Sequence, residues 1–251
     1  MRLNGKVVIV TGGARGLGKS YAMRIAAEGA RVVIADVLEG RSVKSGIEKA
    51  GAQALALHVD VTNEQDVENM INQTVREFGR IDVLINNAAI FADVIKNRFY
   101  DMPLQEWEKM IRINLTGTFL CCKAVYPQMK KQKKGKIINV SSATVYMGNP
   151  NLSHYVTSKA AIIGLTRSMA REAGDDGISV NAIAPGFTLS EAVDGNPTFP
   201  EPVRKMVVES RCFKRDEVPG DLLGAIVFLA SDDSDFITGQ TLVIDGGAVM
   251  H

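Results

Sequence analysis

Tyr155 and Lys159 have the residue types and the spacing that proton transfer requires. They stand four residues apart in the segment YVTSK (155–159), so on a helix they lie on the same face. A free tyrosine has a pKa near ~10 and is a poor base at neutral pH, but a neighbouring ammonium stabilises the phenolate. Such a pair could exchange a proton with an alcohol or carbonyl oxygen. Because Tyr/Lys pairs are also common on helix surfaces, the spacing alone does not show that this pair is catalytic.

Other chemically useful side chains stand where apolar runs end. Ser142 follows the run 136–140, and its hydroxyl could bind the reacting oxygen, whereas Asn114 lies inside a long helical pattern. If the apolar runs are parallel strands, their carboxyl ends share one edge of the sheet and these segments converge there. Residues expected to line a substrate pocket beside them are Thr144, Tyr146 and Phe187, with His154 interpreted as a neutral pocket or surface histidine.

The glycine-rich segment TGGARGLGKS (11–20) fits two phosphate-binding patterns. Its last eight residues match the G-x-x-x-x-G-K-[ST] loop of nucleotide triphosphatases. Gly12, Gly16 and Gly18 instead match the T-G-x-x-x-G-x-G loop that brings a dinucleotide pyrophosphate to a helix N-terminus. The residues that follow this loop indicate which of the two patterns applies.

Asp36 ends the second apolar run, at the distance where a dinucleotide fold places an acid against the adenosine ribose. A carboxylate there accepts hydrogen bonds from the ribose hydroxyls and repels a 2′-phosphate, which favours NAD over NADP. Arg15 argues the other way, because a guanidinium could pair with that phosphate. Asp36 carries more weight, since Val37 adds no second positive charge. The alternative role for Asp36 is a helix cap.

Apolar β-branched runs alternate with helical patterns along the whole chain, which predicts one doubly wound α/β domain over residues 1–251 with a parallel sheet. The expected strands are Val7–Val10, Arg31–Ala35, Ala54–Val59, Val83–Ile85, Lys136–Val140, Ser179–Ala184 and Thr241–Ile244. The expected helices are Gly16–Glu28, Glu39–Ala50, Glu64–Phe78, Leu104–Met129, Ser153–Ala173 and Val218–Ala230.

The segment between Pro185 and Pro219 breaks this rhythm with several prolines and three phenylalanines. A long insert after a sheet strand is uncommon unless it forms a lid or a binding loop. We therefore expect a substrate lid at about 188–218.

The bulk composition excludes several classes of protein. A formal net charge of +1 offers no field that would recruit nucleic acid or an anionic membrane. No apolar stretch approaches the length of a membrane span or a signal peptide core. Three cysteines, two of them adjacent, suit a reducing compartment. We expect a cytoplasmic location and no metal site.

Taken together, these motifs resemble the short-chain dehydrogenase/reductase family from Gly5 to nearly His251. The resemblance implies a Rossmann-type seven-stranded parallel sheet with helices on both faces. It implies Asn114, Ser142, Tyr155 and Lys159 as the catalytic tetrad. The residues implied to contact the cofactor are Gly12, Arg15, Gly16, Leu17, Gly18, Asp36, Val37, Asp60, Val61, Asn87, Ala88, Ala89, Tyr155, Lys159, Pro185, Gly186, Thr188 and Ser190.

The resemblance also implies how these residues act. Ser142 would hold the substrate oxygen, Tyr155 would move the proton, and the nicotinamide of NAD would exchange a hydride with a secondary alcohol or ketone. Lys159 would lower the tyrosine pKa and bind the nicotinamide ribose, while Asn114 would position a water that relays protons.

Two positions depart from the family pattern, and the chain end carries a further likeness. Ala89 replaces a glycine, and Ser190 replaces a threonine that binds the carboxamide. The segment 236–247 resembles the family's tetramer-forming terminal strand, so a homotetramer is expected. The tail 248–251 is similar to that of relatives oxidising secondary alcohols such as 1-phenylethanol, or pyridoxal.

Three alternative functions remain open at this point. A 3-oxoacyl-thioester reductase of the same family could use the basic run Lys130–Lys136 to bind an acidic carrier, although Asp176 stands where such enzymes tend to carry a base. Asp36 also disfavours their usual NADPH. The other two are a nucleotide triphosphatase and a non-catalytic dinucleotide sensor.

Overall fold

The computed structural model describes residues 1–194, 196 and 198–250. It contains a parallel seven-stranded sheet with the strand order β3-β2-β1-β4-β5-β6-β7. The order reverses between β1 and β4, and in such sheets ligands bind beyond the carboxyl ends of the strands at this point. The predicted fold class is confirmed.

All seven expected strands form, with ends shifted by no more than one or two residues. Their bounds are β1 Val7–Thr11, β2 Arg31–Asp36, β3 Ala54–His58, β4 Val83–Asn86, β5 Gly135–Val140, β6 Ile178–Pro185 and β7 Thr241–Ile244. The α-helices are α1 Gly16–Ala27, α2 Arg41–Lys49, α3 Glu64–Phe78, α4 Leu104–Ile111, α5 Gly117–Gln132, α6 Thr144–Met147, α7 Ser153–Ala173, α8 Glu201–Ser210 and α9 Pro219–Ala230.

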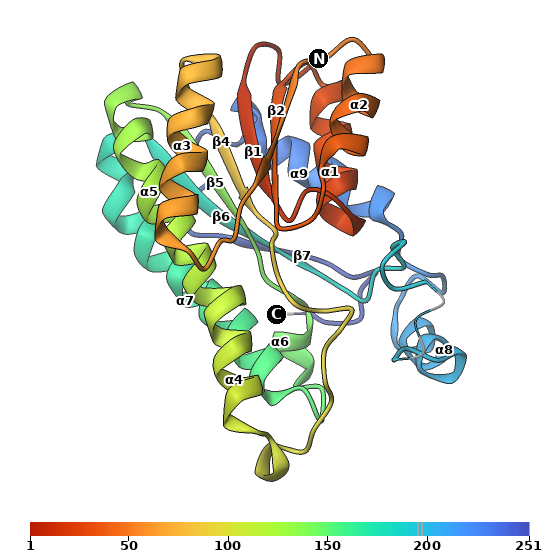
Figure 1. The fold of residues 1–251 in the computed structure, drawn as a ribbon. Coiled ribbons are helices and arrows are strands. Elements are labelled where there is room, and N and C mark those ends of the chain that lie inside the picture. Colours follow the sequence, from red (N-terminus) through yellow and green to blue (C-terminus); the bar gives the residue numbers. More distant parts are fainter. Residues whose placement is uncertain (195, 197, 251) are drawn as a thin grey trace.

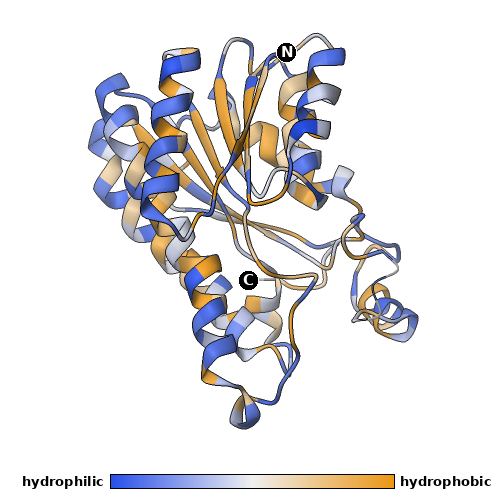
Figure 2. Cartoon of the chain, viewed as in Figure 1, coloured by the Kyte–Doolittle hydropathy of each residue, from blue (hydrophilic) through white to orange (hydrophobic). Residues whose placement is uncertain are grey.

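Helices cover both faces of the sheet (Figure 1). One core joins the sheet to α1, α2 and α9, and a second joins it to α3, α5 and α7. Successive side chains of a strand point to opposite faces, so Val8 and Val10 of β1 enter the first core while Ile9 enters the second. Figure 2 shows the apolar strands between helices whose outer surfaces are polar. Burial on both faces explains why the strands are apolar throughout rather than alternating.

The predicted helix 104–129 is not one uninterrupted α-helix. It consists of α4 and α5 with a π-helical turn, η2 (Arg112–Thr116), between them. A π turn inserts one extra residue into the helix and is frequent at functional sites. Local periodicity does not reveal it, because the apolar pattern continues across the turn.

The lid is more ordered than its proline content suggested. It contains α8, which begins after Pro200 with Pro202 in its first turn, where the missing proline N–H costs no helical hydrogen bond. Figure 1 shows α8 standing away from the sheet. Pro197 of the expected lid and His251 of the expected tail lie outside the described residues.

No helix within the described part of the chain is long and apolar enough to cross a membrane. The adjacent Cys121 and Cys122 are buried in α5 as free thiols, and burial raises the pKa of both.

Candidate active site

Thr11 and Asn87 join the carboxyl ends of β1 and β4. The Thr11 hydroxyl accepts hydrogen bonds from the Asn87 and Ala88 amides at 3.0 and 3.1 Å, and Asn87 Nδ2 donates to the Thr11 and Gly12 carbonyls at 3.0 Å. A Cβ on Gly12 would lie 2.8 Å from Ala88 Cα, and its φ is +63°. Glycine is therefore required here both for its backbone angle and for the close approach of the two loops.

The N-terminus of α1 already binds an anion supplied by the chain itself. The Gly16 amide donates to Glu191 Oε1 at 3.2 Å, and Lys19 Nζ lies 2.9 Å from the other carboxylate oxygen. These two contacts lower the pKa of Glu191, so the carboxylate is charged. The glycine loop thus presents a backbone donor and a lysine to a negative group, which is the chemistry that a pyrophosphate requires.

Asp36 lies at the end of β2 and faces the glycine loop. Its carboxylate accepts hydrogen bonds from the Ala14 and Leu38 amides, both at 2.9 Å. The cap hypothesis is wrong, because α2 begins five residues later with Gly40 as its N-cap. Asp36 therefore sits between the glycine loop and the chain after β2, where an adenosine ribose would meet a dinucleotide-binding sheet.

The neighbouring cofactor candidates are placed around the same edge. Arg15 is half-exposed and pairs with Asp93 at 3.3 Å, so its charge is partly neutralised. Val37 is exposed, while the Asp60 carboxylate accepts the Thr62 amide at 2.8 Å. Val61 is buried, and its side chain occupies the space that a Cβ on residue 117 would need. Leu17 packs against the first core.

Tyr155 and Lys159 lie one turn apart on α7, with Lys159 Nζ 5.9 Å from the centre of the tyrosine ring. Both are nearly inaccessible to water. Burial raises the pKa of Tyr155 above its ordinary value, and a hydrogen bond with Ser142 offsets only part of this. The expected lowering of the tyrosine pKa by Lys159 is not what the structure shows, since desolvation outweighs it.

Lys159 is itself strongly affected by its surroundings. Its ammonium donates to the Val140 carbonyl at 2.8 Å, and its own carbonyl accepts the Ser141 hydroxyl at 2.8 Å. Burial lowers the pKa of Lys159 to about 8. The bond to Val140 holds the amine at the end of β5, the strand that Ser142 follows.

Asn114 lies in the middle of the π turn η2 and is buried. Its Oδ1 accepts the Ile90 amide at 2.9 Å, and its Nδ2 donates to Ser158 Oγ at 3.1 Å. Ser158 in turn donates to the Tyr155 carbonyl at 2.8 Å. The π turn thus directs the asparagine towards α7 and ties it to the turn of helix that carries the tyrosine.

Aromatic side chains from three segments form a cluster next to Tyr155, with Phe91 in contact with its ring. Phe91 follows β4, and its ring centre lies 5.3 Å from that of Tyr155 and 5.2 Å from that of Phe199 in the lid. Phe187 lies 5.0 Å from Phe199 and 6.4 Å from Phe91. We refer to Phe91, Phe187 and Phe199 as the phenylalanine cluster.

The remaining predicted residues also gather near these strand ends. The Pro185 carbonyl accepts a hydrogen bond from the Ala143 amide, and the Gly186 amide donates to the Ile244 carbonyl. Thr188 is buried. Ser190 is buried beside the glycine loop, and Ala89, which replaces the family's glycine, is exposed.

The three residues after Ser142 and before Tyr155 that were expected near the substrate take different environments. Thr144 and Tyr146 lie on the short helix α6, and the Thr144 hydroxyl has no hydrogen-bond partner in the described part of the structure. His154 is buried rather than exposed, and burial lowers its pKa, so it is neutral near pH 7.

The sequence did not predict the roles of Phe91, Phe199 and Glu191. It also did not predict that the Thr11 hydroxyl joins the ends of β1 and β4. Only Thr11 had a usable signal, because it begins the glycine motif. The others act through contacts between segments that lie far apart in the sequence.

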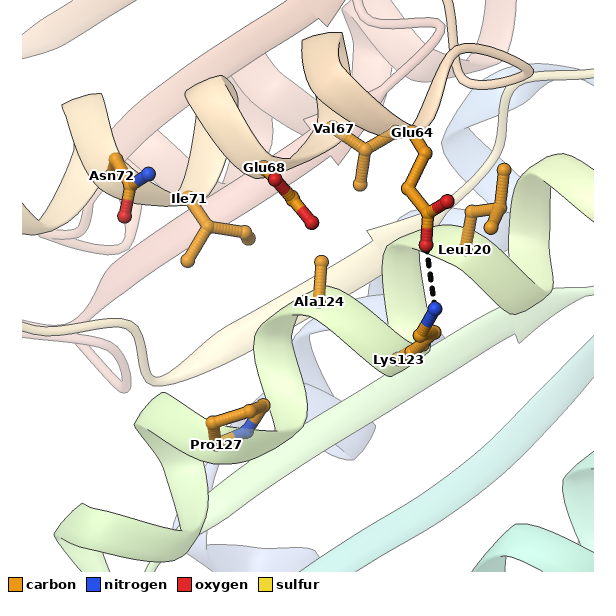
Figure 3. A pocket seen from close by; sticks show the side chains of 9 residues that line it. All are labelled: Glu64, Val67, Glu68, Ile71, Asn72, Leu120, Lys123, Ala124 and Pro127. Carbon is orange, nitrogen blue, oxygen red and sulfur yellow. Dashed lines mark hydrogen bonds and ion pairs between the residues drawn. The ribbon is translucent and has the colours of Figure 1, made fainter.

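A separate hollow lies between α3 and α5, lined by Val67, Ile71 and Ala124 among others and spanned by an ion pair between Glu64 and Lys123 (Figure 3). None of the candidate site residues lines it, so we do not assign it to the reaction.

Comparisons with known proteins place this geometry in a family. A family model described as enoyl-(acyl carrier protein) reductase matches residues 12–249. The chain is 40% identical over 252 residues to a 3-oxoacyl-[acyl-carrier-protein] reductase of Synechocystis, covering 99% of this chain and 98% of that protein. A reductase of the same name from Thermotoga maritima is 38% identical over 255 residues, with both chains fully covered. The chain belongs to the short-chain dehydrogenase/reductase family.

A solved structure agrees with this assignment. Levodione reductase superposes with a TM-score of 0.92 at 33% identity, covering 98% of each chain. The protein is therefore an oxidoreductase that acts with a nicotinamide cofactor. The triphosphatase hypothesis loses its support, since Lys19 is an exposed helix lysine paired with Glu191.

Proposed function

We propose that this protein interconverts a secondary alcohol and a ketone, with NAD(H) as its cofactor. The observation that carries the choice of reaction is the convergence of Ser142, Tyr155 and Lys159 at the end of β5, beside the glycine loop. Asp36 supports NAD, because its carboxylate would repel the 2′-phosphate of NADP. Bound NAD(H) supplies the hydride donor or acceptor.

The chain's own residues divide the remaining work. Ser142 Oγ binds the substrate oxygen and Tyr155 exchanges a proton with it. Because burial raises the tyrosine pKa, the phenol is protonated at neutral pH and can serve as the acid in ketone reduction. The Lys159 ammonium faces the space beside Tyr155 and would bind the nicotinamide ribose. Asn114, held by Ile90 and Ser158, positions a water that returns protons to solvent.

The phenylalanine cluster supports an apolar substrate with a ring. Phe199 stacks on Phe91 with 24° between the ring planes and belongs to the same buried cluster as Tyr155, so a substrate that stacks on Phe91 would displace it. A planar group would regain that stacking against Phe91. Replacing Phe91 with Ala should therefore raise KM for ring-bearing ketones more than for short alkyl ketones.

The experiment that tests the assignment is replacement of Tyr155 by Phe, followed by assays of alcohol oxidation and ketone reduction. We expect the loss of almost all turnover, with NADH binding nearly intact in a fluorescence titration. Ordinary activity in this variant would exclude the proposed role. A thermal-shift comparison of NADH, NADPH and ATP adds a readout that does not depend on substrate, and we expect NADH to protect most.

The second candidate is reduction of a 3-oxoacyl thioester, which the names of the relatives at about 40% identity favour. One feature of the surface argues against a basic patch for an acidic carrier. Lys130, Lys134 and Lys136 pair with Asp176, Asp232 and Asp235 at 2.8–3.2 Å. Efficient reduction of acetoacetyl thioesters, with weak activity on simple ketones, would favour this candidate.

We also propose a homotetramer in the cytoplasm. β7 is an edge strand with the half-exposed Leu242, and the adjoining Phe236 is fully exposed. Light scattering after size-exclusion chromatography would show a mass of four chains or overturn this.

A further inference from the structure

Arg211 and Glu217 form a buried ion pair at the base of the lid. Their side chains are 2% and 4% exposed, and Arg211 Nη2 lies 3.4 Å from Glu217 Oε2. Neither residue belongs to the proton-transfer or cofactor groups described above. Burying two charges costs free energy unless hydrogen bonds satisfy them, so their other partners show what the pair holds in place.

Apart from the Arg215 carbonyl, which accepts a hydrogen bond from Arg211 Nη1 at 3.0 Å, those partners lie at the start of the lid. Arg211 Nη2 donates to the Phe187 carbonyl at 2.7 Å. Glu217 Oε1 accepts the Thr188 hydroxyl at 2.6 Å, and the Glu217 carbonyl accepts the Leu189 amide at 2.7 Å. The pair therefore joins the start of the lid to a segment near its end.

Two glycines let the neighbouring backbone approach the pair closely. A Cβ on Gly186 would lie 2.5 Å from Glu217 Oε2 and 2.8 Å from Asp245 Cβ. A Cβ on Gly246, whose φ is +70°, would lie 3.3 Å from Arg211 Cδ. The pair is thus packed against the chain as it leaves both β6 and β7, so it ties the base of the lid to the ends of these two strands.

We infer that the Arg211–Glu217 pair is a positioning device, which fixes the base of the lid so that Phe187 stays in the phenylalanine cluster and Thr188 stays at the carboxyl edge of the sheet. The inference rests on the proposed function, because it assigns Phe187 to the substrate and Thr188 to the cofactor. Neither Arg211 nor Glu217 touches the reacting atoms, so both act through the main chain that they hold.

The charge on Glu217 is sensitive to pH. Burial raises the pKa of Glu217 to about 7, helped by Asp245 and Asp221, while the hydrogen bond from Thr188 and the charge of Arg211 act in the opposite direction. The buried Tyr21 of α1 also faces this carboxylate. Below about pH 7 Arg211 loses its counter-charge, which weakens the attachment of the lid.

Three variants test the inference through KM and kcat for a ketone at saturating NADH. Glu217→Gln keeps an oxygen for Thr188 but removes the charge. At pH 8 we expect KM to rise about three- to tenfold while kcat changes less than about twofold. The wild-type KM should rise on acidification through pH 7, and the variant should lack this rise. Arg211→Lys, which keeps the charge but not the planar fork, should restore only part of the affinity lost in Arg211→Met.

Two further variants separate positioning from stability. Arg211→Met/Glu217→Leu replaces the pair with apolar side chains, which commonly preserves stability, yet it removes the bonds to Phe187 and Thr188. We expect it to fold and still show the raised KM. Arg204→Met is the matched control, because Arg204 pairs with Asp216 at 3.2 Å within the lid but does not touch its first residues.

The outcomes distinguish this inference from the proposed function. A wild-type KM in the folded double variant and in Glu217→Gln would overturn the positioning role. If the wild type reduced no ketone with NADH, the proposed function would fail. Limited proteolysis would then test the positioning role of the Arg211–Glu217 pair separately. Faster cleavage within 188–218 in Glu217→Gln than in Arg204→Met would support that role, and equal rates would overturn it.

Discussion

The carboxylate of Glu191 in the lid accepts a hydrogen bond from the Gly16 amide at the start of α1, with a distance of 3.2 Å. Lys19 holds the same carboxylate at 2.9 Å. The helix terminus that suits a cofactor pyrophosphate is thus satisfied by a group of the protein itself. The lid must release Glu191 before a dinucleotide can take this position, which couples lid movement to cofactor binding.

Replacing Glu191 with Gln should therefore tighten NADH binding. The neutral amide competes less well for the Gly16 amide and Lys19, and we expect Kd to fall about three- to tenfold, on the scale where tenfold is ~1.4 kcal/mol. Fluorescence titration with NADH measures this directly. Glu209→Gln, the same change on α8, is the control and should leave Kd unchanged. Weaker binding in Glu191→Gln would instead show that the carboxylate supports the bound state.

Asp36 should set the choice between NADH and NADPH. We expect the wild type to prefer NADH, and Asp36→Asn to reduce the ratio of kcat/KM for NADH over NADPH at least tenfold, because the charge that repels the 2′-phosphate is lost. Asp93→Asn removes a carboxylate that pairs with Arg15 but leaves Asp36 in place, so it should change the ratio less. A wild-type preference for NADPH would mean that Arg15 outweighs Asp36.

The two directions of the reaction should respond differently to pH. Burial raises the pKa of Tyr155, so the phenol that donates a proton to a ketone stays protonated from pH 7 to pH 10. Alcohol oxidation needs the ionised form, so its kcat/KM should rise as the pH increases from 7 to 10, while that of ketone reduction should change little. Initial rates in both directions across this range test the expectation, and an oxidation optimum below pH 7 contradicts it.

Lys159 should make the stability of the cofactor-free protein depend on pH. Its pKa is about 8 in the folded chain, against an ordinary value near ~10.4 for the unfolded chain. Between these values the unfolded chain binds more protons, so the contribution of Lys159 to the free energy of unfolding rises with pH. At pH 7 the buried charge costs up to ~3 kcal/mol.

Urea unfolding of Lys159→Met measures this cost. Relative to the wild type, the variant should be more stable at pH 7 than at pH 9.5, by up to ~2 kcal/mol. Lys131→Met, at an exposed position of α5, should show the same difference from the wild type at both pH values. An equal effect of Lys159→Met at the two pH values would show that burial does not lower the pKa of the amine, which would then be charged in the folded state at both pH values.

The order of strands and helices and the glycine loop follow from the sequence alone, which also predicts the residues of the proposed proton-transfer site. These depend on signals within about twenty residues: apolar runs for strands buried on both faces, glycines where the backbone must turn, and a Tyr/Lys pair one helical turn apart. In a doubly wound sheet the carboxyl ends of all strands share one edge, so topology alone brings Asp36, Ser142 and Tyr155 together.

Only the tertiary structure decided how that edge is covered and held. The π turn at Asn114, the stacking of Phe199 on Phe91, the bond of Glu191 to α1 and the pair of Arg211 with Glu217 leave no periodic signal. Each depends on two segments meeting in space. Burial then reversed one expectation from sequence: it raised the pKa of Tyr155, because desolvation of the phenolate exceeds the stabilisation that its neighbours provide.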